Sequence, residues 1–131
     1  MEPESRRLLT GLRHGLLRLH KALLEWERTT YEQAHGRQSG GELLKLLLDH
    51  PQFAWLRPMS QLIVRIDEML EDDAPLSDAD VDDVVAGLRV LTLADERTDG
   101  HGLRYDAALQ ASPEAVLAHR DLVAEMKNRG R

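Results

Sequence analysis

Leucine recurs at helical spacing through the first quarter of this 131-residue chain, and this pattern constrains the fold more than any other feature. No proline occurs from Ser5 to about Ala34. Since the period matches one face of an α-helix, the segment predicts a single helix of about 45 Å. Gly11 and Gly15 weaken this helix by about 1 kcal/mol each relative to alanine, and they indicate a bend or a close helix crossing. The apolar residues that carry the pattern are Leu9, Leu12, Leu16, Leu19, Leu23 and Trp26.

Three serines mark the starts of further helices. Ser39 and Ser77 are each followed three residues later by an acidic residue, which is the pattern of a capping box. Ser112 precedes a proline that suits a first helical turn. These caps predict a short helix through residues 43–48, a helix from Ser77 to about residue 91, and a final helix over residues 113–128.

The remaining boundaries come from proline and glycine. Pro51 suits the first turn of a helix that runs to about residue 71, and Pro58 should kink or split that helix because proline removes a backbone donor. Residues 94–102 are predicted to form the longest loop, with His101 in a flexible, solvated turn, and a short helix over 103–110 follows. We therefore expect an all-α fold in one domain, residues 1–131: a bundle of about four principal helices plus two short ones, with a long N-terminal helix.

Cysteine is absent from the chain, and this excludes several kinds of site. A disulfide scaffold, a zinc–thiolate site, an iron–sulfur cluster and a thiol nucleophile all require that residue. No apolar stretch approaches the roughly 18 residues of a membrane span, and the N-terminus lacks the pattern of a signal peptide. We expect a cytoplasmic protein that makes no membrane contact.

The sequence contains no motif that names a reaction. Glycine-rich phosphate loops and the Gly-x-Ser-x-Gly nucleophile elbow are both missing. Asp78-x-Asp80-x-Asp82 resembles the opening of a calcium loop, but Asp83 stands where such a loop needs glycine and Arg89 where it needs glutamate. Carboxylates at a helix start instead offset the helix dipole. The sequence thus leans against an enzyme, without excluding one.

Charge is unevenly distributed along a chain whose net charge is −6. Residues 1–21 hold five basic residues against two acids, whereas residues 66–99 hold twelve acids against two arginines. This asymmetry is typical of a solvated acidic face, and the alternative is electrostatic docking of a basic partner or of a second subunit. The acidic composition of the domain as a whole argues against nucleic acid as a partner.

Several polar residues fall on the apolar faces of the predicted helices. They lie on the first helix, on the helix after Pro51 and on the last helix. Our interpretation is an internal ion-pair or hydrogen-bond network, for example His119 against Glu27 or Asp67, with no cofactor. The alternative is a metal, haem or small-ligand site, although the Glu-x-x-His spacing of di-iron bundles does not occur. The candidate ligand residues are His20, Glu27, Tyr31, Asp67 and His119.

Function is predicted from shape and surface alone. A helix of about 45 Å would overhang a compact bundle of this size, and its leucines span much of its circumference. We therefore expect a protein–protein interaction role, either self-assembly into a homo-oligomer or binding of a protein partner as an adaptor. The candidate interface residues are Leu8, Leu17, Leu24, Trp26, Trp55 and Arg57, although both tryptophans also suit a core.

Overall fold

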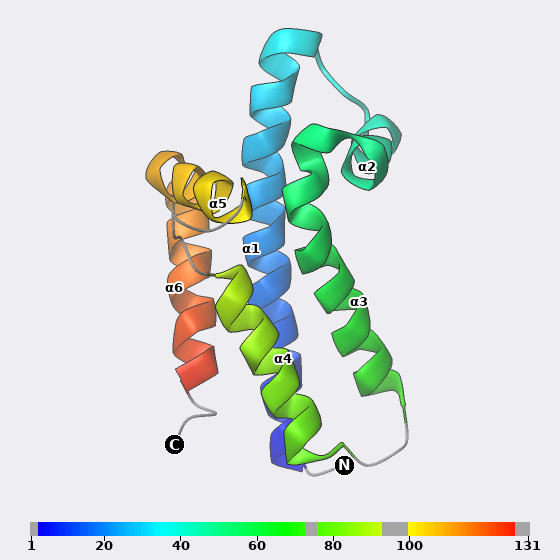
Figure 1. Cartoon of the computed structure of the whole chain (residues 1–131), viewed down its shortest axis with the longest axis vertical. Helices are drawn as coiled ribbons and strands as arrows, with labels where there is room; N and C mark the ends of the chain where they lie inside the picture. The colour runs from blue at the N-terminus through cyan, green and yellow to red at the C-terminus, as the bar shows by residue number, and fades with distance from the viewer. Residues whose placement is uncertain (1–2, 73–75, 93–99, 128–131) are drawn as a thin grey trace.

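The computed structural model describes residues 3–72, 76–92 and 100–127, and these residues form helices and no strands. The predicted all-α bundle with a long N-terminal helix is therefore confirmed (Figure 1). None of the described helices is long and apolar enough to cross a membrane. The elements are α1 (Pro3–His35), α2 (Gly40–Asp49), the 3-10 helix η1 (Pro51–Leu56), α3 (Arg57–Glu71), α4 (Asp78–Leu91), α5 (Gly100–Ala111) and α6 (Pro113–Lys127).

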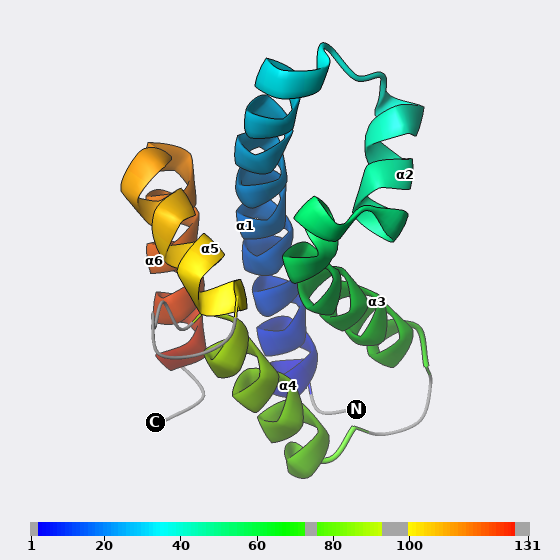
Figure 2. The same ribbon diagram turned by 45° about the horizontal axis from the view of Figure 1, so that its top comes forward.

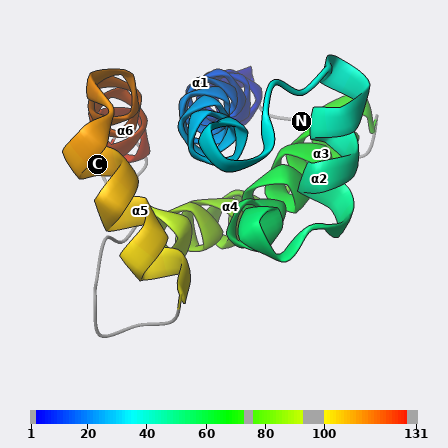
Figure 3. The same cartoon turned by 90° about the horizontal axis from the view of Figure 1, so that it is seen from above.

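The long helix α1 is the centre of the bundle. Seen from above, α1 lies between α6 on one side and α3 on the other, while α4 and α5 form a second layer beneath them (Figure 3). The leucines that predicted this helix are fully buried against these neighbours, which explains why one helix can carry so wide an apolar surface. They are Leu9, Leu12, Leu16, Leu19 and Leu23.

A close helix crossing joins α1 to α6 at Gly15, which is one of the two alternatives that the glycines indicated. A Cβ atom placed on Gly15 would lie 3.0 Å from Leu122 Cδ1 and 3.6 Å from Leu122 Cα. Leu122 is itself fully buried. Glycine at this position therefore permits an approach of the two backbones that any side chain would obstruct.

The chain between α2 and α3 is divided as the prolines predicted. The capping box of Ser39 and Glu42 opens α2. Pro51 then starts η1, and Pro58, in the first turn of α3, marks the split between η1 and the longer helix. Figures 1 and 2 show α2 at the edge of the bundle, so that this helix leaves one side toward solvent.

The second layer differs from the prediction at the start of α5. The capping box of Ser77 and Asp80 opens α4 as expected. Of the predicted loop over residues 94–102, residues 94–99 lie outside the described part of the chain, and α5 begins at Gly100 rather than at residue 103. His101 was therefore wrongly predicted to be a solvated loop residue: it is half-buried in the first turn of a helix.

Basic residues of α1 make contacts within the same molecule. Arg6 donates to the carbonyl oxygen of Leu70 at 2.9 Å, and Arg13 pairs with Asp67 of α3. Arg18 pairs with Asp121 of α6 at 3.0 Å, although both side chains are largely exposed. The first two contacts place part of the basic N-terminal segment against the acidic segment 66–99.

Candidate binding site

Glu27 is the fully buried carboxylate of α1, and three side chains donate to it. The indole Nε1 of Trp55 donates to Oε1 at 2.9 Å, and the amide of Gln52 donates to Oε2 at 3.1 Å. Nη2 of Arg104 lies 2.7 Å from each carboxylate oxygen. Since an isolated buried charge is very costly, these donors are what allow Glu27 to occupy the interior.

Arg104 reaches Glu27 from α5, 77 positions away in the sequence. Its guanidinium carbon lies 4.6 Å from the centre of the Trp26 ring, a cation–π arrangement. The ring of Trp26 in turn meets Trp55 edge-on, with centroids 6.3 Å apart. The Arg104 side chain stays 40% exposed, so that the ion pair has one buried end and one end open to solvent.

The short helix η1 places Trp55 and Gln52 because both of its ends are fixed. At the start, the ring Nδ1 of His50 accepts from the backbone N–H of Gln52 at 3.1 Å. At the end, Arg57 donates to the carbonyl oxygens of Leu47 and His50, each at 2.9 Å. Arg57, predicted as an interface residue, therefore ties α2 and η1 to the start of α3.

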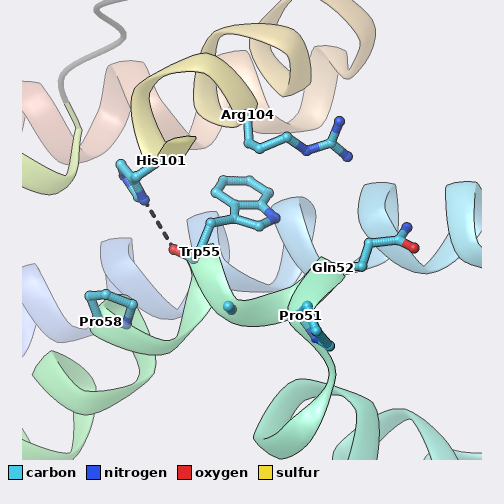
Figure 4. Close-up of a pocket in the computed structure, with 7 residues that line it drawn as sticks. Pro51, Gln52, Trp55, Pro58, His101 and Arg104 are labelled. Atoms are coloured by element: carbon cyan, nitrogen blue, oxygen red, sulfur yellow. Dashed lines mark hydrogen bonds between the residues drawn. The ribbon is translucent and has the colours of Figure 1, made fainter. Parts of the chain in front are cut away.

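A groove of about 620 Å³ opens beside this ion pair (Figure 4). Its size falls within the range of pockets that bind small ligands. The walls come from three elements and are mostly apolar, with Arg104 at one side. The lining residues are Pro51, Gln52, Ala54 and Trp55 of η1, Pro58 of α3, and His101 and Arg104 of α5.

His101 closes the groove with both of its ring nitrogens against backbone carbonyls. Nδ1 lies 3.0 Å from the oxygen of Trp55, and Nε2 lies 2.7 Å from the oxygen of Leu91. The ring also stacks on Tyr105, with centroids 5.7 Å apart. His101 thus connects the end of α4, η1 and α5 at the edge of the groove.

The other ligand candidates from the sequence have partners of their own. His20 hydrogen-bonds Ser60 at 2.7 Å. The buried phenol of Tyr105 forms a hydrogen bond with Nδ1 of His119 at 2.6 Å, and burial raises the pKa of Tyr105, which keeps the phenol protonated. The example pairing of His119 with Glu27 or Asp67 is therefore not what the structure shows. Asp67 pairs with Arg13.

Tyr31 belongs to an aromatic cluster at the end of α1. Its ring stacks on His35 with centroids 4.3 Å apart and meets the rings of His50 and Phe53 at 5.4 and 5.8 Å. Across the residues that the structure describes, no three His, Asp or Glu side chains lie close enough together to hold a metal ion. The geometry therefore offers no support for a metal centre built on the five candidates.

His20 and His119 make the stability of the protein sensitive to pH. Burial lowers the pKa of His20 and of His119 below the ordinary value of 6.5. The unfolded chain therefore takes up protons on these histidines at higher pH than the folded chain does. The stability that the neutral, buried rings contribute is fully present above pH 6.5 and is lost as the pH falls. We expect the urea midpoint to be lower at about pH 5.5 than at about pH 7.5.

A His20→Gln/His119→Gln double variant is the control for this pH effect, and its midpoint should fall less. The lowered carboxylate pKa values of Glu32, Glu42 and Asp80 do not interfere. Their stabilisation is lost only below their ordinary values of 4.5 and 3.8, outside the measured window. Equal wild-type urea midpoints at the two pH values would contradict the assignment of this pH dependence to His20 and His119.

The predicted interface residues are mostly not exposed. Leu8, Leu17, Leu24 and Trp26 are partly buried and pack against the core, and Trp55 is buried. The large apolar side chains that do face solvent lie on other helices. Those that the structure describes are Leu44, Leu48, Val64, Val90, Leu103, Val116 and Leu117.

Sequence reasoning identified Glu27 and Trp55 but missed Gln52, His101 and Arg104. Gln52 is an ordinary polar residue next to a proline, and Arg104 lies in a helix of weak amphipathic pattern. A usable signal existed for Arg104, because a buried carboxylate requires a cationic or multiply donating partner somewhere in the chain. That signal does not say which cation is the partner.

Comparison with known proteins gives no relationship on which to base a function: no protein-family model matches the chain, and neither curated proteins nor solved structures gave a match. Function is therefore inferred from the groove and the exposed surface.

Proposed function

We propose that this protein is a small interaction module that holds a segment of a partner protein in the groove between η1 and α5. The observation that carries the proposal is the open end of the Arg104–Glu27 pair beside an apolar wall. Apolar surface with a few fixed polar groups is the usual make-up of binding sites. An adaptor role would use a rigid bundle to present such a groove.

The exposed side of α2 supports a second candidate, self-assembly. Leucine occupies half of this ten-residue helix, and Leu43 is its buried member. Leu44 and Leu48, one turn apart on the same face, are 57% and 62% exposed. Such a ridge can pack on the same ridge of a second copy in a two-fold symmetric contact.

Site-specific photocrosslinking in the native host tests both candidates. Benzoylphenylalanine is placed at Ala54 in the groove, at Leu48 on α2 and, as a control, at Val64, which is 54% exposed and does not line the groove. We expect position 54 to give one partner adduct that position 64 does not give. An adduct of twice the chain mass from position 48 would support self-assembly. Identical adducts at 54 and 64, or none at 54, would contradict the groove proposal.

A further inference from the structure

Arg104 has hydrogen-bonding capacity that the protein does not use. A guanidinium donates from all of its nitrogens, but Glu27 accepts from Nη2 alone. Among the described residues, none accepts a hydrogen bond from Nη1 or Nε of Arg104. These donors belong to a side chain that is 40% exposed and lines the groove.

The position of the Arg104 guanidinium is fixed before anything binds. The carboxylate of Glu27 holds one edge, and the face of Trp26 supports the plane at 4.6 Å. A donor held in this way loses little conformational freedom when an acceptor arrives, which favours binding. Figure 4 shows the Arg104 side chain extending beside Trp55 rather than folding back over it.

An apolar wall adjoins Arg104. Pro51, Ala54, Trp55 and Pro58 line the groove next to Arg104, and both prolines are exposed. A ligand that uses both features brings an acceptor to the remaining donors of Arg104 and an apolar group to the wall. The last residue of a polypeptide does so, since its carboxylate and its side chain share one carbon atom.

We propose that the groove recognises the C-terminal residue of a partner chain, with the free carboxylate accepting from Arg104 and an apolar side chain packing on Trp55 and the prolines. This inference rests on the proposed function, because it names the part of the partner that the groove holds. Charge-assisted hydrogen bonds from arginine to a carboxylate are among the stronger polar contacts. The carboxylate is therefore expected to dominate recognition.

NMR titration of the full chain with matched tripeptides tests the inference. The probes are acetyl-Ala-Ala-Leu with a free carboxylate and the same peptide as its amide. We expect the acid to shift the Trp55 indole and Arg104 Nε signals and to bind at least tenfold more tightly than the amide. Arg104→Lys should bring the affinity for the acid close to that for the amide, because lysine can still pair with Glu27 but lacks the spare guanidinium donors. Arg120→Lys, at a residue 71% exposed on α6, is the matched control and should bind like the wild type.

The other outcomes separate this inference from the proposed function. Equal shifts of groove signals by acid and amide would overturn carboxylate recognition and leave the groove a binding site. Equal binding of 4-methylpentanoate would assign the site to small organic acids rather than to chain ends. If no probe shifts the groove signals, C-terminal recognition is wrong, and the crosslinks at position 54 decide the proposed function separately.

Discussion

Replacement of Glu27 by alanine should lower the free energy of unfolding by about 3 kcal/mol. The substitution removes the acceptor of Trp55, Gln52 and Arg104 in one step. Breaking a buried ion pair costs roughly 3 to 5 kcal/mol, and the lower end applies because Arg104 is 40% exposed and can be hydrated again. Glu27→Gln should cost less, since its amide oxygen can still accept from Trp55.

Urea unfolding followed by circular dichroism measures this loss without relying on the tryptophans that contact Glu27. Glu25→Ala is the matched control on the same helix. Its side chain is 51% exposed and pairs with Arg28 at 3.6 Å, so the change should cost less than about 0.5 kcal/mol. If Glu27→Ala and Glu25→Ala give the same small loss, the buried carboxylate does not organise the site as described.

The direction in which Glu27 points could be predicted from the sequence, but its partner could not. Helical periodicity gives the angle of a side chain around its own axis, and that angle placed Glu27 toward the interior. It gives neither the height nor the rotation of a second helix. Arg104 lies 77 positions away on α5, which has little apolar periodicity of its own. The example pairing of His119 with Glu27 or Asp67 failed to appear for the same reason.

Features that depend on residues close together in the sequence were predicted correctly, whereas contacts between distant helices were not. The capping boxes at Ser39 and Ser77 and the split at Pro58 depend on neighbours within a few residues, and all three appear in the structure. His101 was misjudged because Gly100 and Gly102 resemble a loop, whereas its ring contacts Trp55 and Leu91 of other elements. Tertiary contacts of this kind override a weak local propensity.

The interface candidates on α1 were chosen without knowing how many helices lie against it. Leu8, Leu17 and Leu24 seemed too widely spread for one neighbouring helix to cover. In the bundle, α1 lies between α6 and α3 with the second layer beneath, so that several helices cover it (Figure 3). The exposed apolar ridge is instead on α2, which lies at the edge of the bundle and has fewer neighbours.

Replacement of Gly15 by leucine should destabilise the protein by about 3 kcal/mol, because two backbones meet at this residue. Overpacking of a well-packed contact costs roughly 1 to 3 kcal/mol and occasionally more. Leu122 cannot move away easily, since it is fully buried and its Cα would lie 3.6 Å from the new Cβ. The gain in helix propensity, at most about 1 kcal/mol, offsets only part of this cost.

Alanine substitutions separate helix propensity from packing at this crossing. At Gly87, in the interior of α4, a new Cβ would meet Leu62 at an ordinary 3.7 Å, so Gly87→Ala should stabilise the protein by about 0.5 to 1 kcal/mol. At Gly15 the same change brings Cβ to 3.0 Å from Leu122 Cδ1, and the gain should vanish or reverse. Thermal and urea unfolding of the two variants measure the difference. If Gly15→Ala stabilises as much as Gly87→Ala, the α1–α6 crossing has room that the structure does not show, and Gly15 reflects helix geometry rather than close packing.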